Sequence, residues 1–155
     1  MREALFDIAG TRLRGGRFLD LFSGSGAVGL EAFSRGASQV VLVDSREVVT
    51  RTLRSTCDRL DLQSVETIRL DLPRQLGRLT AAGGFDWIFA DPPYAFEQYP
   101  DLIAGLPELL STGGVAVVEH DARVELPIAV GEAQRYDQRR YGECALSFYA
   151  ASPVD

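Results

Sequence analysis

Four consecutive residues, Asp91-Pro92-Pro93-Tyr94, could carry out chemistry on an amine. Proline has no backbone N–H and a fixed φ, so this stretch presents carbonyl acceptors on a stiff backbone. The Asp91 carboxylate and the Pro92 carbonyl can each accept one N–H of an exocyclic amine, which would aim the nitrogen lone pair at a methylsulfonium. Tyr94 can stack on a base held outside its helix. The tetrapeptide predicts methylation of an exocyclic amino nitrogen, with Asp91, Pro92 and Tyr94 as catalytic residues.

A proline-rich turn after a strand is the alternative interpretation of this segment. The attack itself needs no strong general base, because the amine is uncharged and its proton can leave afterwards. His120 is the only histidine, and we interpret it as an ordinary residue at a strand end.

A glycine loop precedes the tetrapeptide in the chain. Gly24-Ser25-Gly26-Ala27-Val28-Gly29 fits G-x-G-x-x-G after a predicted strand, and Asp44 ends the next strand. Glycine lets a ligand approach the backbone, and a carboxylate at that position can accept hydrogen bonds from two ribose hydroxyls. Gly29 differs from the other two glycines, because close helix–sheet packing explains it without a ligand.

The loop alone does not separate a nicotinamide cofactor from S-adenosylmethionine. Asp20 lies shortly before Gly24, at the mouth of the first strand. Its carboxylate suits the cationic ammonium of a methionine moiety and would repel a pyrophosphate. A cap for the glycine turn is the other interpretation of Asp20.

Short apolar runs alternate with helical periods, which predicts a mainly parallel sheet covered on both faces. The expected strands are 17–22, 39–44, 65–70, 85–90 and 115–119. The expected helices are 2–9, one that follows the turn at 23–26 and runs to about Arg35, one that follows Ser45, and those at 72–81 and 99–110. Ser45 is the expected cap of the third helix, with Leu60 on its apolar stripe. Residues 133–140 and 144–150 are too close for a parallel connection, so they predict an antiparallel hairpin.

Composition narrows the class of protein further. The chain has 155 residues, 46% of them apolar, and a net charge of −6, which argues against a generic polyanion binder. We expect a single domain over residues 1–155, a cytoplasmic location, no membrane span and no metal. Cys57 and Cys144 lack metal-like spacing and are expected to be reduced. Arginines concentrate in the first seventeen residues, which makes that end the better candidate for contact with nucleic acid.

With both motifs in place, the chain resembles the Rossmann-like class I methyltransferases that carry D/N-P-P-Y/F. Within them it most resembles the bacterial 16S ribosomal RNA guanine-N2 methyltransferase family. Beyond the tetrapeptide, the matching segments are Arg2-Glu3-Ala4-Leu5-Phe6, Phe18-Leu19-Asp20-Leu21-Phe22-Ser23-Gly24-Ser25-Gly26-Ala27-Val28-Gly29-Leu30-Glu31-Ala32 and Tyr141-Gly142-Glu143-Cys144-Ala145-Leu146-Ser147-Phe148-Tyr149. The resemblance implies a seven-stranded sheet with a C-terminal hairpin, and methyl transfer from S-adenosylmethionine to the N2 amine of a guanine. The implied partner is 16S rRNA or a small-subunit assembly particle, bound by a monomer.

The resemblance also implies roles for individual residues in binding the cofactor. Asp20, Gly24 and Gly26 would hold the methionine end, Asp44 would bind the ribose, and Asp71 would contact the adenine amine. Phe22 and Leu72 are further expected cofactor-binding residues. An acid such as Asp71 at a helix start also serves as a cap or dipole partner. Family members carry a hairpin and a basic, threonine-containing segment ahead of the first helix. We expect that extension, with its share of the RNA affinity, to be missing from a chain that starts at Met1.

Three other functions remain open at this point. An amino-methyltransferase could act on adenine or cytosine in DNA, although the chain has little room for a target-recognition region, or on a protein glutamine. A cofactor-binding remnant would lack activity. A nicotinamide-dependent oxidoreductase would depend on the glycine pattern alone.

Overall fold

The computed structural model describes residues 2–151. Helix α1 (Arg2–Ala9) confirms the helix predicted for residues 2–9, and a 3-10 helix, η1 (Gly10–Leu13), follows it. Leu5, Phe6 and Ala9 lie along α1. All three side chains are buried, so α1 packs against the sheet through one face. Within the described residues, no helix combines the length and the apolar character needed to cross a bilayer.

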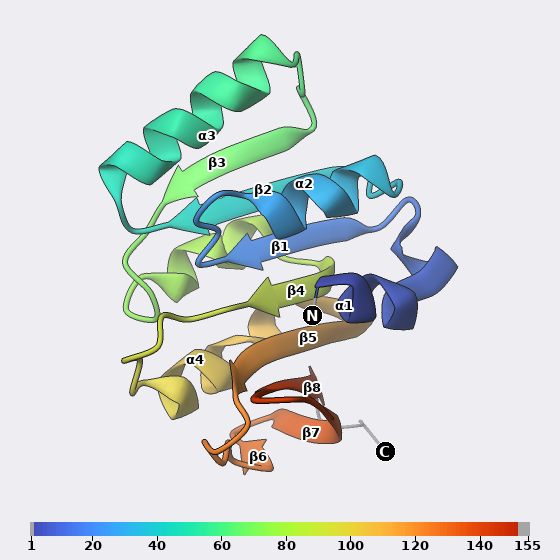
Figure 1. Cartoon of the computed structure of the whole chain (residues 1–155), viewed down its shortest axis with the longest axis vertical. Helices are drawn as coiled ribbons and strands as arrows, with labels where there is room; N and C mark the ends of the chain where they lie inside the picture. Colours follow the sequence, from blue (N-terminus) through green and yellow to red (C-terminus); the bar gives the residue numbers. More distant parts are fainter. Residues whose placement is uncertain (1, 152–155) are drawn as a thin grey trace.

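One twisted sheet forms the centre of the molecule (Figure 1). Its strands are β1 (Arg17–Leu21), β2 (Gln39–Asp44), β3 (Val65–Arg69), β4 (Phe85–Ala90), β5 (Leu110–Asp121), β6 (Ala129–Val130), β7 (Ala133–Tyr141) and β8 (Cys144–Ala151). The order is β3-β2-β1-β4-β5-β8-β7-β6. Strands β1 to β5 pair in parallel, whereas β8 runs antiparallel to β5 and forms a hairpin with β7. The predicted parallel sheet with a closing hairpin is confirmed, and the two-residue β6 adds an eighth strand.

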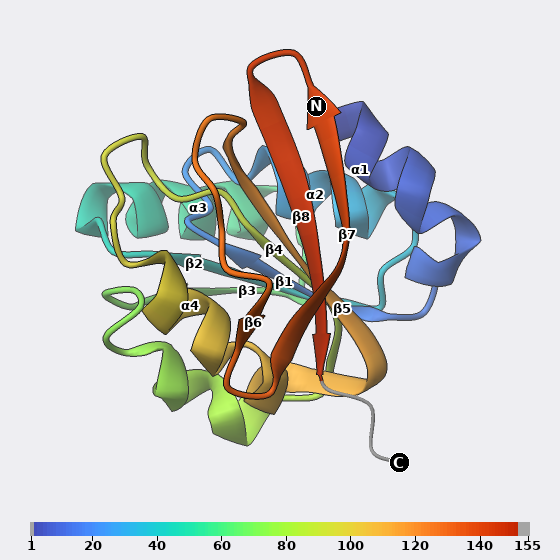
Figure 2. The ribbon, with the colours of Figure 1, turned by 90° about the horizontal axis from the view of Figure 1, so that it is seen from below.

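Helices cover both faces of the sheet, as Figure 2 shows in a view turned by 90°. One face packs against α1, α2 (Ala27–Ser34) and α3 (Glu47–Arg59). The other face packs against η2 (Leu76–Ala82), α4 (Tyr99–Gly105) and η3 (Pro107–Leu109). Because both faces are buried, β1, β2 and β4 consist of near-continuous apolar runs, which explains why their positions could be predicted from the sequence.

Several local predictions were wrong. Residues 72–81 form a turn followed by the 3-10 helix η2, and the helix predicted for 99–110 ends at Gly105, because Pro107 cannot continue it and Leu110 already belongs to β5. Ser45 does not cap α3: the N-cap is Arg46, and no side chain caps that end. Leu60 is 56% exposed, since α3 ends at Arg59 before completing the apolar stripe.

The order of the strands creates a crevice at the carboxyl edge of the sheet. The chain runs outward from β1 to β2 and β3, then returns to place β4 on the other side of β1. The loops after β1 and β4 therefore diverge at a topological switch point, where open α/β sheets bind their ligands. The glycine loop and the tetrapeptide follow these two strands.

Candidate active site

The loop between β1 and α2 depends on glycine at two positions with positive φ. Gly24 has φ 55° and Gly26 has φ 77°. A Cβ added to Gly26 would lie 2.6 Å from Leu53 Cδ2, whereas one added to Gly24 would meet nothing within 4 Å. Gly26 thus allows the loop to pack on α3, and Gly24 leaves open space in which a ligand could reach the backbone.

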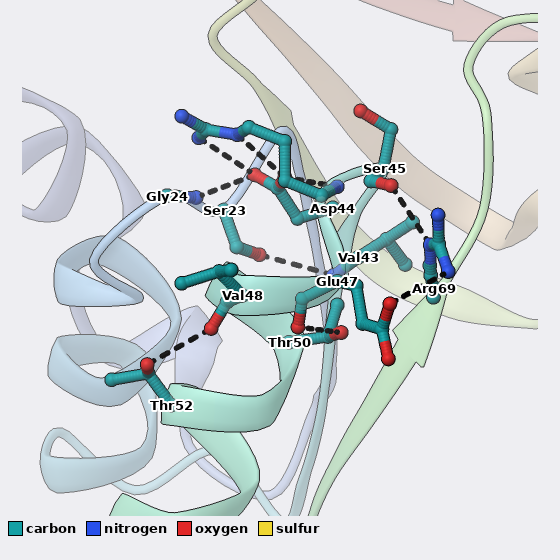
Figure 3. A network of polar contacts seen from close by, with 11 residues as sticks. Ser23, Gly24, Val43, Asp44, Ser45, Glu47, Val48, Thr50, Thr52 and Arg69 are labelled. Atoms are coloured by element: carbon teal, nitrogen blue, oxygen red, sulfur yellow. Dashed lines mark hydrogen bonds and ion pairs between the residues drawn. The ribbon is translucent and has the colours of Figure 1, made fainter.

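Asp44 ties the glycine loop to the end of β2, as Figure 3 shows. The Gly24 N–H donates to Asp44 Oδ2 at 3.0 Å, while the backbone N–H and Nε of Arg46 donate to Oδ1 at 3.0 and 3.1 Å. Burial by itself would raise the pKa of Asp44, but the hydrogen bonds from Arg46 and Gly24 outweigh it and lower the pKa. Asp44 is therefore an ionised acceptor at neutral pH, with the exposed Arg46 side chain lying against it.

Phe22 follows β1 directly and has φ 60°, a left-handed conformation that is rare for a bulky side chain. Its ring packs edge-on against Phe96, with the centroids 5.4 Å apart. Phe22, Asp44, Asp91 and Pro93 all line a cavity of about 330 Å³. Backbone strain of this kind is typical of functional sites, and here it directs an apolar ring to the wall of a polar cavity.

Asp20 is buried beneath the glycine loop, with 2% of its surface exposed, and is not one of the residues that line the cavity beside Asp44. Its Oδ2 accepts the Gly29 N–H at 3.0 Å, which fixes the first turns of α2 against β1. Burial raises the pKa of Asp20 to about 7, although the hydrogen bonds from Gly29 and Ser23 oppose the rise and the nearby charge of Asp91 adds to it. Asp20 therefore positions the glycine loop from beneath. Gly29 has the packing role expected for it, because a Cβ there would collide with Leu42.

The tetrapeptide leaves β4 with its acceptors free. Within residues 2–151, neither the Asp91 carboxylate nor the Pro92 carbonyl accepts a hydrogen bond, whereas the Pro93 carbonyl accepts the Phe96 N–H at 2.9 Å. Asp91 is accessible to solvent, yet the surrounding protein desolvates it enough to raise its pKa. Two free oxygen acceptors on a rigid turn are the arrangement that an amine donor requires.

A second cavity, of about 370 Å³, lies on the other side of Asp91 and Pro92. Aromatic side chains of Phe96 and Tyr99 form part of its wall, with their rings 4.9 Å apart. Tyr94 also lines it and is 89% exposed, so its ring is free to contact a substrate. Asp91 lines both cavities and therefore marks the place where two ligands could meet.

His120 and Glu119, on β5, contribute to the second cavity in different ways. His120 is buried, and its ring nitrogens contact Ser147 Oγ at 2.8 Å and the Asp121 carbonyl at 2.9 Å. Burial lowers the pKa of His120, so the ring is neutral and already hydrogen-bonded, in agreement with a structural role. Burial also raises the pKa of Glu119 to about 7, with the charge of Asp91 contributing.

Four carboxylates thus follow the carboxyl edge of neighbouring strands, which we call the acidic row: Asp44, Asp20, Asp91 and Glu119. The row crosses β2, β1, β4 and β5, and Asp91 raises the pKa of both Asp20 and Glu119. Such an edge attracts cations and donors of hydrogen bonds, and it disfavours phosphate.

Not every residue expected at the site lies there. Asp71 is exposed and pairs with Arg74 at 3.0 Å, and Leu72 is buried in the core; of the described residues, neither lines the two cavities. In the N-terminal basic segment, Arg17 donates to the Ala82 and Gly83 carbonyls, whereas Arg12 and Arg14 are exposed.

Glu119 is a site residue that the sequence patterns do not reveal. The signal available was its place at the end of a buried strand, the same place that Asp91 has after β4. Without the strand order, nothing in the sequence put these two ends side by side.

The sheet order, the hairpin and the loop at the switch point together define the fold of the class I methyltransferases. The chain belongs to the family described as "Conserved hypothetical protein 95", whose model matches residues 1–150. This membership agrees with the resemblance seen in the sequence.

Individual relatives extend the comparison. A Bacillus subtilis protein named "Putative rRNA methyltransferase YlbH" is 35% identical over 153 residues, which cover 96% of this chain and 83% of the relative. "Ribosomal RNA small subunit methyltransferase D" of Buchnera aphidicola from Acyrthosiphon pisum is 36% identical over 94 residues, 61% of this chain and 49% of that protein. A solved structure of a conserved hypothetical protein from Streptococcus pyogenes is 32% identical, with a TM-score of 0.79 and coverage of 99% and 96% of the two chains.

Proposed function

We propose that this protein transfers a methyl group from S-adenosylmethionine to the exocyclic N2 amine of a guanine in small-subunit ribosomal RNA. The observation that carries the proposal is the position of Asp91, which lines two cavities: one beside the glycine loop, and one walled by aromatic rings that Pro92 also lines. The names of the relatives support an RNA substrate, and one of them names the small ribosomal subunit. Ribosomal RNA would place this activity in the cytoplasm.

The residues of the first cavity fit the methyl donor. Asp44 is an ionised, buried acceptor suited to ribose hydroxyls, and Phe22 gives an apolar wall. Gly24, in the loop that is hydrogen-bonded to Asp44, leaves the backbone approachable. S-adenosylmethionine supplies an electrophilic methyl group on a sulfonium, a cation that the acidic row would attract. Asp20 would act on the methionine end, through the loop it holds and through its charge. For Asp71 and Leu72 an adenine contact remains part of the proposal, and it requires the segment after β3 to approach the cavity.

The second cavity would receive the amine. The Asp91 carboxylate and the Pro92 carbonyl would each accept one N–H, which directs the nitrogen lone pair toward the first cavity and stabilises the charge as it forms. Tyr94, largely exposed beside these acceptors, would stack on the base. One proton leaves the nitrogen after the attack and the other stays on the methylated amine, so no strong base is needed and His120 takes no part.

The test is methyl transfer from labelled cofactor to small ribosomal subunits, free rRNA, DNA and total protein. Label in the rRNA, located on a guanine by mass spectrometry, is expected, and label only in DNA or only in protein would contradict the proposal. Asp91→Ala should lower the rate by at least about 100-fold because a preorganised acceptor is lost. Asp101→Ala, which removes an exposed carboxylate on α4, is the matched control and should keep full activity.

Binding of S-adenosylhomocysteine separates loss of chemistry from loss of cofactor. Asp91→Ala should keep most of this binding, because the remaining contacts of the first cavity are intact. In cells, rRNA from a deletion strain should lack one N2-methylguanine that the wild-type chain restores and the Asp91→Ala chain does not.

A further inference from the structure

Glu119 lies beside Asp91 at the end of the neighbouring strand. Strands β4 and β5 pair in parallel, with Phe89 opposite Val117 and Ala90 opposite Val118. The next residue along the chain is Asp91 after β4 and Glu119 on β5, so these two residues are neighbours. Side chains alternate along a strand, which puts both carboxyl groups on the face where Phe89 and Val117 are buried. Neighbouring strands are about 4.8 Å apart, a spacing that allows two carboxylates to bind one planar molecule.

Glu119 is also available to a ligand. Its side chain is half-buried, lines the second cavity, and within residues 2–151 has no hydrogen bond or ion pair. Of the other ionisable groups of that wall, Asp121 holds Arg123 through contacts of 3.0 and 2.8 Å and His120 is bound to Ser147, whereas Glu143 lies in the turn between β7 and β8. At the adjoining ends of β4 and β5, Asp91 and Glu119 therefore remain able to accept new hydrogen bonds.

The Watson–Crick edge of guanine matches such a pair. Guanine presents two adjacent donors there, N1–H and the N2 amine, whereas adenine and cytosine present a ring nitrogen acceptor beside their amine. A carboxylate opposite that ring nitrogen would meet a lone pair, which is repulsive. An acceptor beside Asp91 therefore selects guanine among the amino-bearing bases.

We propose that Glu119 is the residue that determines specificity for guanine, by accepting N1–H while Asp91 and the Pro92 carbonyl accept the N2 hydrogens. The inference rests on the proposed function and adds to it the means by which the base is chosen. Phe96 and Tyr99 add aromatic rings to the wall of the same cavity, against which a base could pack.

The test uses 2-aminopurine, which keeps the N2 amine but has no N1–H. Once the methylated guanine has been located, RNA fragments carrying guanine or 2-aminopurine at that position are compared for kcat/KM. The wild-type protein should prefer guanine by about 10- to 100-fold, the value of one hydrogen bond to a charged group. Glu119→Leu should lose about that factor on guanine and no longer distinguish the two bases.

Two further variants identify the cause. Glu119→Gln keeps an oxygen acceptor and should retain the preference for guanine, and Glu125→Leu, an exposed site outside the cavity, should behave as wild type. Binding of S-adenosylhomocysteine, measured by calorimetry, establishes that each variant is folded.

The inference is overturned if the wild-type protein uses both bases equally, or if Glu119→Leu keeps the preference for guanine. Either result would leave the proposed function standing, since guanine would still be methylated. Failure of the wild-type protein to methylate any guanine would instead refute the proposed function, and this inference with it.

Discussion

The buried carboxyl group of Asp20 should make the stability of this protein decrease with rising pH. The pKa of Asp20 is 3.8 in the unfolded chain and about 7 in the folded one. Between these pH values the folded state holds a proton that the unfolded state has released, so the free energy of unfolding falls as pH rises from about 4 to 7. The difference corresponds to about 4 kcal/mol, which is lost in full above pH 7.

Replacing Asp20 with Asn isolates this effect. Asn keeps an oxygen that can accept the Gly29 N–H but cannot ionise, so the variant lacks the pH-dependent loss. At pH 8, Asp20→Asn should be more stable than the wild type by up to about 4 kcal/mol, and at pH 4 the two should be similar. Asp91 and Glu119, whose pKa values are also raised, are present in both proteins and cancel in the comparison.

Urea unfolding, followed by the fluorescence of the single, buried Trp87, measures this difference at each pH. Asp101→Asn, at an exposed position, is the control and should follow the wild type throughout. If the wild type and Asp20→Asn show the same pH dependence, Asp20 is ionised in the folded protein at neutral pH and the reasoning from burial is wrong.

Two other substitutions test the glycine loop and its partner acid. Gly29→Ala should destabilise the fold by about 1–2 kcal/mol, because the collision with Leu42 costs more than the better helix propensity of alanine gains; an unchanged urea midpoint would contradict this. Asp44→Ala should weaken binding of S-adenosylhomocysteine by about 10- to 100-fold, because the hydrogen bonds to ribose are lost. Arg46→Ala removes only the exposed partner of Asp44 and should change the affinity by less than about fivefold. Calorimetry decides between these outcomes.

The sequence predicted correctly those parts of the fold that depend on a single local pattern, such as the apolar run of a buried strand. Strands β2 and β4 match their predicted limits because apolar runs buried on both faces end abruptly at Asp44 and Asp91. The segment after β3 was mistaken for an α-helix because its apolar residues, among them Leu76 and Leu79, suit the tighter 3-10 spacing equally well.

The candidate site was predictable only where its residues lie close together in the chain. The glycine loop and the tetrapeptide could be recognised locally. Glu119 could be recognised as a site residue only from the pairing of β4 with β5. In the same way, only the folded structure shows that Asp71 pairs with Arg74 and does not line the first cavity. Both depend on long-range packing, which local patterns do not record.

The acidic row described above has a consequence for turnover. Before the reaction the donor carries a positive sulfonium, and after it the spent donor is a neutral thioether. Both species keep the ammonium of the methionine end, but a line of carboxylates attracts the donor more strongly because of its extra positive charge, so the edge of the sheet would favour exchange of product for fresh donor. Inhibition by the product should therefore weaken, relative to binding of the donor, as the acids of the row ionise.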